Sequence, residues 1–178
     1  MPHFAVSAVG RDRSGIVAAV TGVLVDTGCN IEDSSMSILR GHFAMMLLVA
    51  GPDGLDADRL EQALAKPAAD YDLVLAVRAI DDDVPPSPEG SQWTVSVYGA
   101  DRPGIVHQVA KTLADAGANI VDLTTRVIGD ADRPVYAMVI DVTLPPGTSA
   151  DDLGPRLADL GRELGIECSM HEADADIL

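Results

Sequence analysis

One segment of this chain occurs twice, and the repetition constrains the fold more than any other feature. Residues 4–39 and residues 93–128 align without a gap at an offset of 89, with 15 identities over 36 positions. Solenoid repeats are typically only about 20–50 residues long, so we expect each copy to be a small domain instead.

The identities concentrate in two short motifs. The first, Gly-x-Asp-Arg-x-Gly-Ile-Val, begins at Gly10 and again at Gly99. The second, Gly-x-Asn-Ile-x-Asp, begins at Gly28 and again at Gly117. A hydrophobic core requires apolar residues at matched positions, but it does not require Gly, Asp, Arg and Asn. The two motifs therefore hold the candidate functional residues.

Hydrophobic spacing predicts the same order of elements in both copies. In the first copy we expect strands over 4–9, 30–39, 43–50 and 72–80, one helix ending before Gly28, and another from Asp56 to Pro67. In the second copy we expect strands over 93–98, 119–128, 134–143 and 166–171, and helices over 103–116 and 149–164. This βαββαβ order predicts an α+β fold of two ferredoxin-like domains, each a four-stranded antiparallel sheet with two helices on one face.

The segment between the copies is acidic and rich in proline. We predict domains over 1–80 and 92–178, joined by a linker over 81–91 that is extended and semi-rigid. The turn over 129–134 is longer than its counterpart in the first copy, and we expect the acidic tail after Glu172 to fray.

Two strands of the first copy are apolar on both sides. Residues 43–50 and 72–80 carry Met, Leu, Val, Ala and Ile at successive positions. Because such a sheet face is usually covered, we expect a neighbouring domain or a second chain to pack on it, and we predict a homodimer. In the second copy the matching face is more polar, because it is interrupted by Asp141, Glu167, Ser169 and His171.

Charge and composition argue against several classes of function. The formal net charge is −16 and aromatic residues make up 3% of the chain, which disfavours direct binding of nucleic acid through phosphate contacts or base stacking. The two cysteines, Cys29 and Cys168, occupy unmatched positions, and no apolar run is long enough to cross a membrane. We therefore expect a cytoplasmic protein without disulfides, membrane contact, bound metal or another cofactor.

The first motif predicts a glycine-flanked turn that leads into a helix. Main-chain N–H groups and the positive end of the helix dipole favour a carboxylate or a phosphate at such a turn. Asn30 and Asn119 begin the second strand of each copy, which we expect to lie beside the end of the first strand. An Asn amide can hold both charged groups of an amino acid, and Asp12 or Asp101 can balance the ammonium group.

Each motif residue also has a purely structural interpretation. The aspartate is a possible helix N-cap, and the second glycine would allow a helix to pack closely on the sheet. The arginine would be solvated or paired with an acid, and the asparagine would suit a turn after a glycine. Recurrence of the whole set in both copies favours a ligand role for at least one of them.

The two motifs resemble the ACT domain, a small-molecule-sensing module. Residues 29–34, with Phe43 and the Met-Leu strand, make the first copy similar in particular to the glycine cleavage system transcriptional repressor family, a tandem ACT pair. The resemblance covers nearly the whole chain apart from the linker and the tail. It implies a regulatory protein and not an enzyme. It also implies that a small amino acid, such as glycine or serine, binds where the first loop of one domain faces the second strand of another.

Carried over position by position, the resemblance implies a set of ligand-binding residues. These are Gly10, Asp12, Arg13, Ser14, Gly15, Asn30 and Ile31 in the first copy, and Gly99, Asp101, Arg102, Pro103, Gly104, Asn119 and Ile120 in the second. Ser14 stands where the motif has proline, so the first loop is expected to be less rigid. The implied function is that of a transcriptional co-regulator of amino-acid (glycine) metabolism that acts through a protein partner.

Two other functions stay open. As a regulatory subunit, the chain would bind an enzyme of amino-acid metabolism and transmit feedback to it. As an acylphosphatase-like enzyme, it would bind phosphate through Arg13 and orient water through Asn30, although Asp12 in the same loop would repel a phosphate. Because the sequence shows no basic face or DNA-reading helix, any transcriptional effect would pass through a DNA-binding partner.

Overall fold

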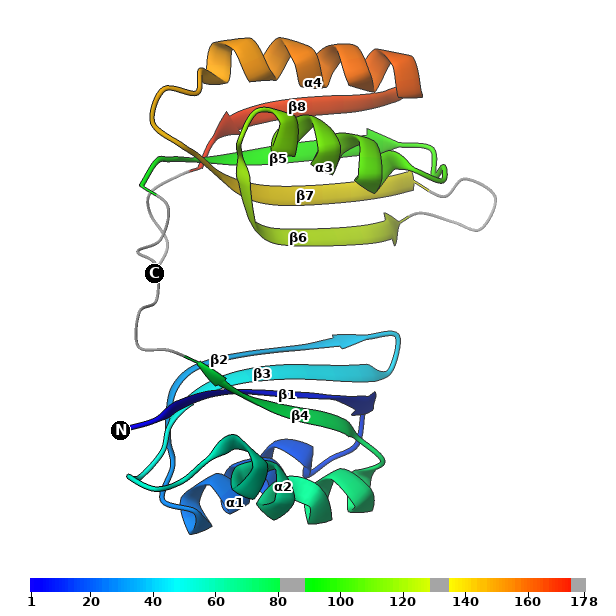
Figure 1. The fold of residues 1–178 in the computed structure, drawn as a ribbon. Coiled ribbons are helices and arrows are strands. Elements are labelled where there is room, and N and C mark those ends of the chain that lie inside the picture. The colour runs from blue at the N-terminus through cyan, green and yellow to red at the C-terminus, as the bar shows by residue number, and fades with distance from the viewer. Residues whose placement is uncertain (81–88, 129–134, 174–178) are drawn as a thin grey trace. The chain divides into compact units, whose positions relative to one another are not determined.

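Two compact units make up the protein. The structure is a computed structural model that describes residues 1–80, 89–128 and 135–173, and these divide into a first unit over 1–80 and a second unit over 89–173. Each unit has the order βαββαβ, with both helices on one side of a four-stranded antiparallel sheet (Figure 1). The predicted α+β fold of two ferredoxin-like domains is confirmed.

The elements of the two units correspond one to one. The first unit contains β1 (His3–Arg11), α1 (Ile16–Asp26), β2 (Asn30–Leu39), β3 (His42–Ala50), α2 (Ala57–Tyr71) and β4 (Val74–Ile80). The second contains β5 (Ser91–Gly99), α3 (Ile105–Asp115), β6 (Asn119–Ile128), β7 (Val135–Leu144), α4 (Ala150–Leu164) and β8 (Ile166–Glu172).

The strand order places the first two strands of each unit parallel to one another. The sheets have the orders β2-β3-β1-β4 and β6-β7-β5-β8, and every neighbouring pair is antiparallel. β1 and β2 both run antiparallel to β3, so β2 starts at the end of the sheet where β1 starts. This arrangement decides which motif residues can meet.

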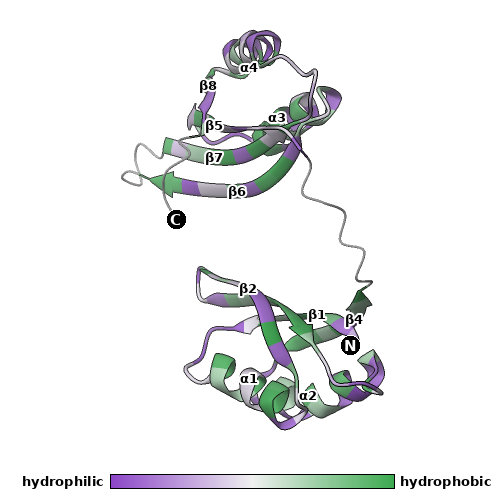
Figure 2. Ribbon diagram, turned by 90° about the vertical axis from the view of Figure 1, so that its left-hand side faces the viewer, coloured by the Kyte–Doolittle hydropathy of each residue, from purple (hydrophilic) through white to green (hydrophobic). Residues whose placement is uncertain are grey.

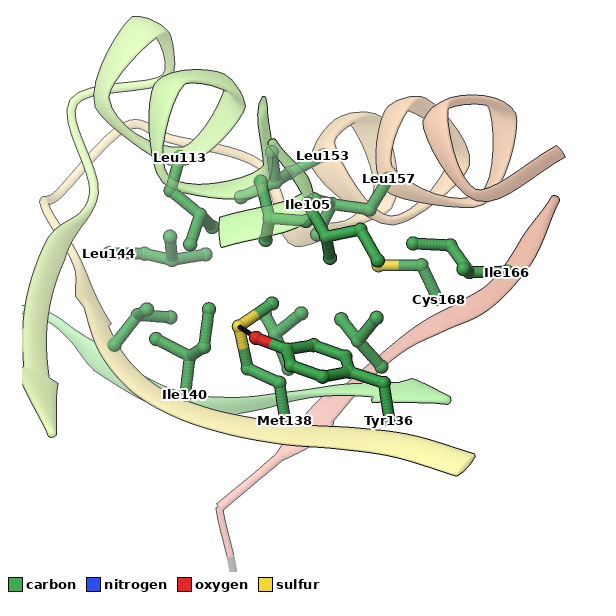
Figure 3. Close-up of a cluster of buried hydrophobic side chains, with 14 residues drawn as sticks. Ile105, Leu113, Tyr136, Met138, Ile140, Leu144, Leu153, Leu157, Ile166 and Cys168 are labelled. Atoms are coloured by element: carbon green, nitrogen blue, oxygen red, sulfur yellow. Dashed lines mark hydrogen bonds between the residues drawn. The ribbon is translucent and has the colours of Figure 1, made fainter. Parts of the chain in front are cut away.

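Apolar residues at four-residue spacing hold each helix to its sheet. Ile16, Val20 and Leu24 of α1 are buried, and the equivalent face of α3 is buried in the second unit. Figure 3 shows the core of the second unit, where the Tyr136 hydroxyl donates to Sδ of Met138 at 3.8 Å. Burial raises the pKa of the Tyr136 phenol, so the hydroxyl stays protonated at neutral pH.

The other side of the first sheet carries no helix. We call the three central rows of this side the open face of the first unit; they consist of Ala5, Ser7, Val9, Asp33, Ser35, Ser37, Ala44, Met46, Leu48, Val74, Ala76 and Arg78. The same side continues with His3, Ala50 and Ile80 at one end and with Arg11, Leu39 and His42 at the other. Val9, Met46 and Val74 are 49%, 51% and 78% exposed. Figure 2 shows in green the hydrophobic residues that run along this sheet. The matching face of the second unit includes the polar residues that the sequence places there.

Two helix boundaries differ from the predictions. Pro67 does not end its helix, because α2 continues to Tyr71 with Pro67 buried inside it. A proline removes its own N–H from the helix, but the surrounding packing can keep the following turn helical. α3 begins at Ile105 and not at residue 103, because Gly104 has a left-handed φ of 97°. The predicted features over 81–88, 129–134 and 174–178 lie outside the described residues.

The close packing of α4 on β8 gives a first prediction. A Cβ on Gly161 would lie 2.9 Å from the Ile166 carbonyl oxygen, whereas a Cβ on Gly154 of the same helix meets nothing within 4 Å. We expect G161A to lower the unfolding free energy of the second unit by about 1–3 kcal/mol. We expect G154A to raise it by about 0.5–1 kcal/mol. Urea unfolding followed by fluorescence of Trp93 measures both, and equal effects would contradict this packing.

Candidate functional site

The first glycine of each motif has a packing role. We call residues Gly10–Gly15 the first loop and residues Gly99–Gly104 the second loop; they join β1 to α1 and β5 to α3. A Cβ on Gly10 would lie 2.7 Å from Cδ2 of Leu73, and one on Gly99 would lie 2.6 Å from Cγ2 of Ile166. These two positions therefore require glycine because the next strand passes close by.

The last glycine of each loop starts the helix. Gly15 and Gly104 are the N-cap residues of α1 and α3, with φ angles of 96° and 97° that side-chain-bearing residues rarely adopt. No side chain caps either helix, so the interpretation of Asp12 and Asp101 as N-caps is wrong. Each helix begins well after its aspartate, and its N-terminus is therefore left open.

Three main-chain N–H groups at each helix start are available to a ligand. In α1 the first amide that donates to the N-cap residue is that of Ala19, which is 2.9 Å from the Gly15 carbonyl oxygen. In α3 it is the amide of Gln108, which is 3.0 Å from the Gly104 carbonyl oxygen. The amides of 16–18 and 105–107 have no protein acceptor in the part of the chain that the structure describes. With the helix dipole behind them, they form a favourable environment for a carboxylate.

The asparagines of the second motif lie at the opposite end of the sheet from the loops. Asn30 is level with Ala50 of β3, whereas the first loop follows Arg11, which is level with His42. Eight residues of strand separate these levels, which is about 26 Å at roughly 3.3 Å per residue. The prediction that Asn30 lies beside its own loop is therefore wrong, because α1 carries the chain back across the sheet before β2 begins.

The second unit has the same geometry. Asn119 is level with Thr143 of β7, whereas Gly99 at the start of the second loop is level with Tyr136 at the other end of that strand. Ile31 and Ile120 accompany the asparagines, each next to a β-bulge. A ligand that contacts both a loop and an asparagine must therefore take them from different units.

The two loops differ in the space around their last glycine. A Cβ on Gly15 would lie 2.7 Å from the hydroxyl oxygen of Tyr71, the last residue of α2. A Cβ on Gly104 would meet nothing within 4 Å. The residue that ends α4 in the second unit is Leu164, so the hydroxyl has no counterpart there. The Tyr71 hydroxyl lies beside the exposed glycine of the first loop, and no atom takes the same place beside the glycine of the second loop.

The arginines of the two loops also differ. Nη1 of Arg102 donates a hydrogen bond to the carbonyl oxygen of Leu164 at 3.1 Å, at the C-terminal end of α4 where a positive charge is favourable. Arg13 forms no hydrogen bond or ion pair with any described residue and is exposed. Arg102 is therefore held beside its own unit, whereas Arg13 is free to meet another group.

Comparison of the loops alone could not find Tyr71, because it lies outside both motifs. The available signal was a difference between the copies: the two equivalent 15-residue helices end in Tyr71 and in Leu164. Positions where two copies diverge next to a shared motif are candidates for a difference in ligand binding.

Metal-binding clusters and membrane-spanning helices are both absent from the described residues. No group of three or more His, Cys, Asp or Glu side chains there is arranged to hold a metal ion. None of the helices α1 to α4 combines the length and the apolar character needed to cross a membrane.

Both units match known domains. Residues 3–78 and residues 93–150 each match a sequence profile of the ACT domain. The chain belongs to the ACT-domain family. This tandem ACT protein is 28% identical over 149 residues to the glycine cleavage system transcriptional repressor of Escherichia coli, which covers 84% of this chain and 77% of that protein.

Two other known proteins are similar to most of the tandem ACT pair. Over 146 residues the chain is 29% identical to phosphoserine phosphatase SerB2 of Mycobacterium tuberculosis, which covers 80% of this chain but 34% of that enzyme. A solved structure of an unknown protein from Galdieria sulphuraria is 30% identical with a TM-score of 0.81, and covers 97% of this chain and 98% of that one. A stretch similar to the two units therefore makes up 98% of one solved chain and 34% of a longer enzyme.

The contact between Tyr71 and Gly15 gives a second prediction. We expect G15A and G104A each to cost about 1 kcal/mol or more, because both place a side chain at a positive φ. G15A is expected to cost more, because its methyl group also displaces the Tyr71 hydroxyl. Y71F should remove this excess in the G15A background and change nothing in the G104A background. Thermal unfolding followed by circular dichroism measures the four variants, and equal costs without rescue would contradict the contact.

Proposed function

We propose that this tandem ACT protein is an amino-acid-sensing regulator that binds a small amino acid at its loops and acts through protein partners. The observation that carries the proposal is the set of three unpaired amides that follow each left-handed glycine cap. Membership of the ACT family and the similarity to a protein named as a transcriptional repressor support it.

The proposed ligand is held by its two charged ends. Its carboxylate accepts hydrogen bonds from the amides after Gly104 or Gly15, and Asp101 or Asp12 balances its ammonium group. An asparagine at the start of β2 or β6 in another ACT unit completes the site. The full proposed set is Gly10, Asp12, Arg13, Ser14, Gly15, Asn30, Ile31, Gly99, Asp101, Arg102, Pro103, Gly104, Asn119 and Ile120.

The two loops have different roles in this proposal. The second loop receives the ligand as it stands, because the space beside Gly104 is open. The first loop receives it only when Tyr71 moves away from Gly15. Tyr71 thereby makes the first loop the weaker of the two sites.

The size of the ligand limits its affinity. Glycine and serine have about five and seven non-hydrogen atoms, and the best small ligands gain roughly 1.5 kcal/mol per atom. This ceiling corresponds to a dissociation constant no tighter than about micromolar for glycine and about tens of nanomolar for serine. Binding of this strength follows the concentration of a metabolite pool. The bound amino acid then shifts the protein toward the arrangement that binds it better.

The partners in this proposal are proteins. The net charge of −16 disfavours direct contact with nucleic acid, so control of transcription, including that of glycine metabolism, passes through a DNA-binding protein. We place no catalytic step on the chain. A homodimer also belongs to the proposal, because the side of the first sheet without helices is largely apolar and exposed.

A regulatory subunit of an amino-acid metabolic enzyme is the second candidate function. The observation that favours it is the similarity over 146 residues to one part of a longer protein named as a phosphoserine phosphatase. Isolation of the tagged chain from its own cells separates the two functions. A transcription factor as the bound partner supports the first, and a metabolic enzyme supports the second.

A panel of amino acids tests the proposed ligand class. We expect glycine, L-serine or a close relative to raise the melting temperature of the full chain in scanning fluorimetry, because it binds only the folded state. The double variant N30A/N119A should lose this rise while keeping the ligand-free melting temperature. A panel without any effect would contradict the proposal.

Exchange of the residues that end α2 and α4 tests which loop binds. With glycine or L-serine added, we expect the amide NMR signal of Gly104 to shift at lower concentration than that of Gly15. Y71L should bring the Gly15 response close to that of Gly104, and L164Y should weaken the response of Gly104. If Gly15 of the unaltered chain responds as readily as Gly104, Tyr71 does not control access.

A further inference from the structure

The sheet register arranges the open face of the first unit in three cross-strand rows. From β2 to β4, the rows are Asp33-Leu48-Ala5-Arg78, then Ser35-Met46-Ser7-Ala76, then Ser37-Ala44-Val9-Val74. Ten of these 12 side chains are apolar or small and neutral. The two ionisable ones, Asp33 and Arg78, have opposite charge and stand at the two edges of the same row.

The equivalent rows of the second unit have a different character. They are Asp122-Asp141-Thr94-His171, Thr124-Val139-Ser96-Ser169 and Arg126-Ala137-Tyr98-Glu167, with six ionisable residues. Asp122 and Asp141 stand directly opposite each other, an arrangement that favours hydration over close packing. The central rows of the first sheet are therefore suited to burial, whereas those of the second sheet are suited to contact with water.

We propose that the open face of the first unit binds a second copy of this chain, face to face, about a two-fold axis parallel to the strands. Such an axis places β2 of one copy over β4 of the other. Each cross-strand row of one copy then faces the same row of the second copy. Asp33 of one copy then faces Arg78 of the other, and the pair occurs twice. The many Ala and Ser side chains let the sheets approach to the usual spacing of about 10 Å.

The charges at the edges are free to form these pairs. Within residues 1–80, 89–128 and 135–173, the Asp33 carboxylate accepts a hydrogen bond from the neighbouring Ser34 amide at 2.7 Å and from no other group, and Arg78 has no ion-pair partner. Met46 and Ser7 lie in the middle row and are expected near the axis. Self-complementarity of this kind is what a two-fold interface requires, and it favours a second copy over an unrelated partner.

Size-exclusion chromatography with light scattering on the full chain tests the proposal. At tens of micromolar we expect twice the chain mass of 18.6 kDa. M46D should give the single-chain mass, because it places a carboxylate in the middle of the interface. V139D makes the same change at the equivalent position of the second unit and should stay dimeric. Melting temperatures of both variants verify that they fold.

Charge exchange tests the orientation of the two copies. D33R and R78D should each weaken the dimer about tenfold or more in sedimentation equilibrium, because each creates two like-charge contacts. The double variant D33R/R78D should regain most of the lost affinity, because the pairs re-form with their charges exchanged. An unaltered chain that is monomeric, or a dimer that M46D leaves intact, would overturn the proposed interface. Failure of the double variant to recover would overturn the two-fold arrangement.

Discussion

The positive φ of the glycine that starts α1 and α3 is the constraint on which the loops depend. A helix that begins at such a glycine has no side chain to cap it, so its first amides keep their hydrogen-bonding capacity and the dipole remains uncompensated. Capping by Asp12 or Asp101 would have satisfied those amides internally. A glycine cap costs a helix start only about a few tenths of a kcal/mol relative to a polar cap, so a site can be kept open for a ligand with little loss of stability.

The strand order then separates the two motifs that the repeat preserves. Each loop and its own asparagine lie at opposite ends of one sheet, because α1 and α3 return the chain to the starting end before β2 and β6 begin. Both motifs can serve one ligand only if units meet. Small domains with thin cores also gain stability from contacts with other units, and the apolar open face of the first unit is a separate surface for such a contact.

The sequence predicts the fold well, because periodic hydrophobicity and a repeated motif report directly on strands and helices. It could not predict that α2 continues past Pro67, since tertiary packing overrode the local preference there. It misplaced Asn30 because the position of a strand start depends on topology and not on sequence distance. Tyr71 was missed for a related reason: it reaches Gly15 through space from a different element.

The repeat has diverged where function would differ. Beside the loops, Tyr71 of the first unit corresponds to Leu164 of the second. On the sheet faces, Leu48 corresponds to Asp141 and Arg78 to His171, while most residues of the loops stay the same. The most direct test of the central claim is a crystal structure of the full chain grown with L-serine. The account predicts the ligand carboxylate within hydrogen-bond distance of the amides that follow Gly104. Side chains of the protein filling that position, or L-serine bound elsewhere, would contradict it.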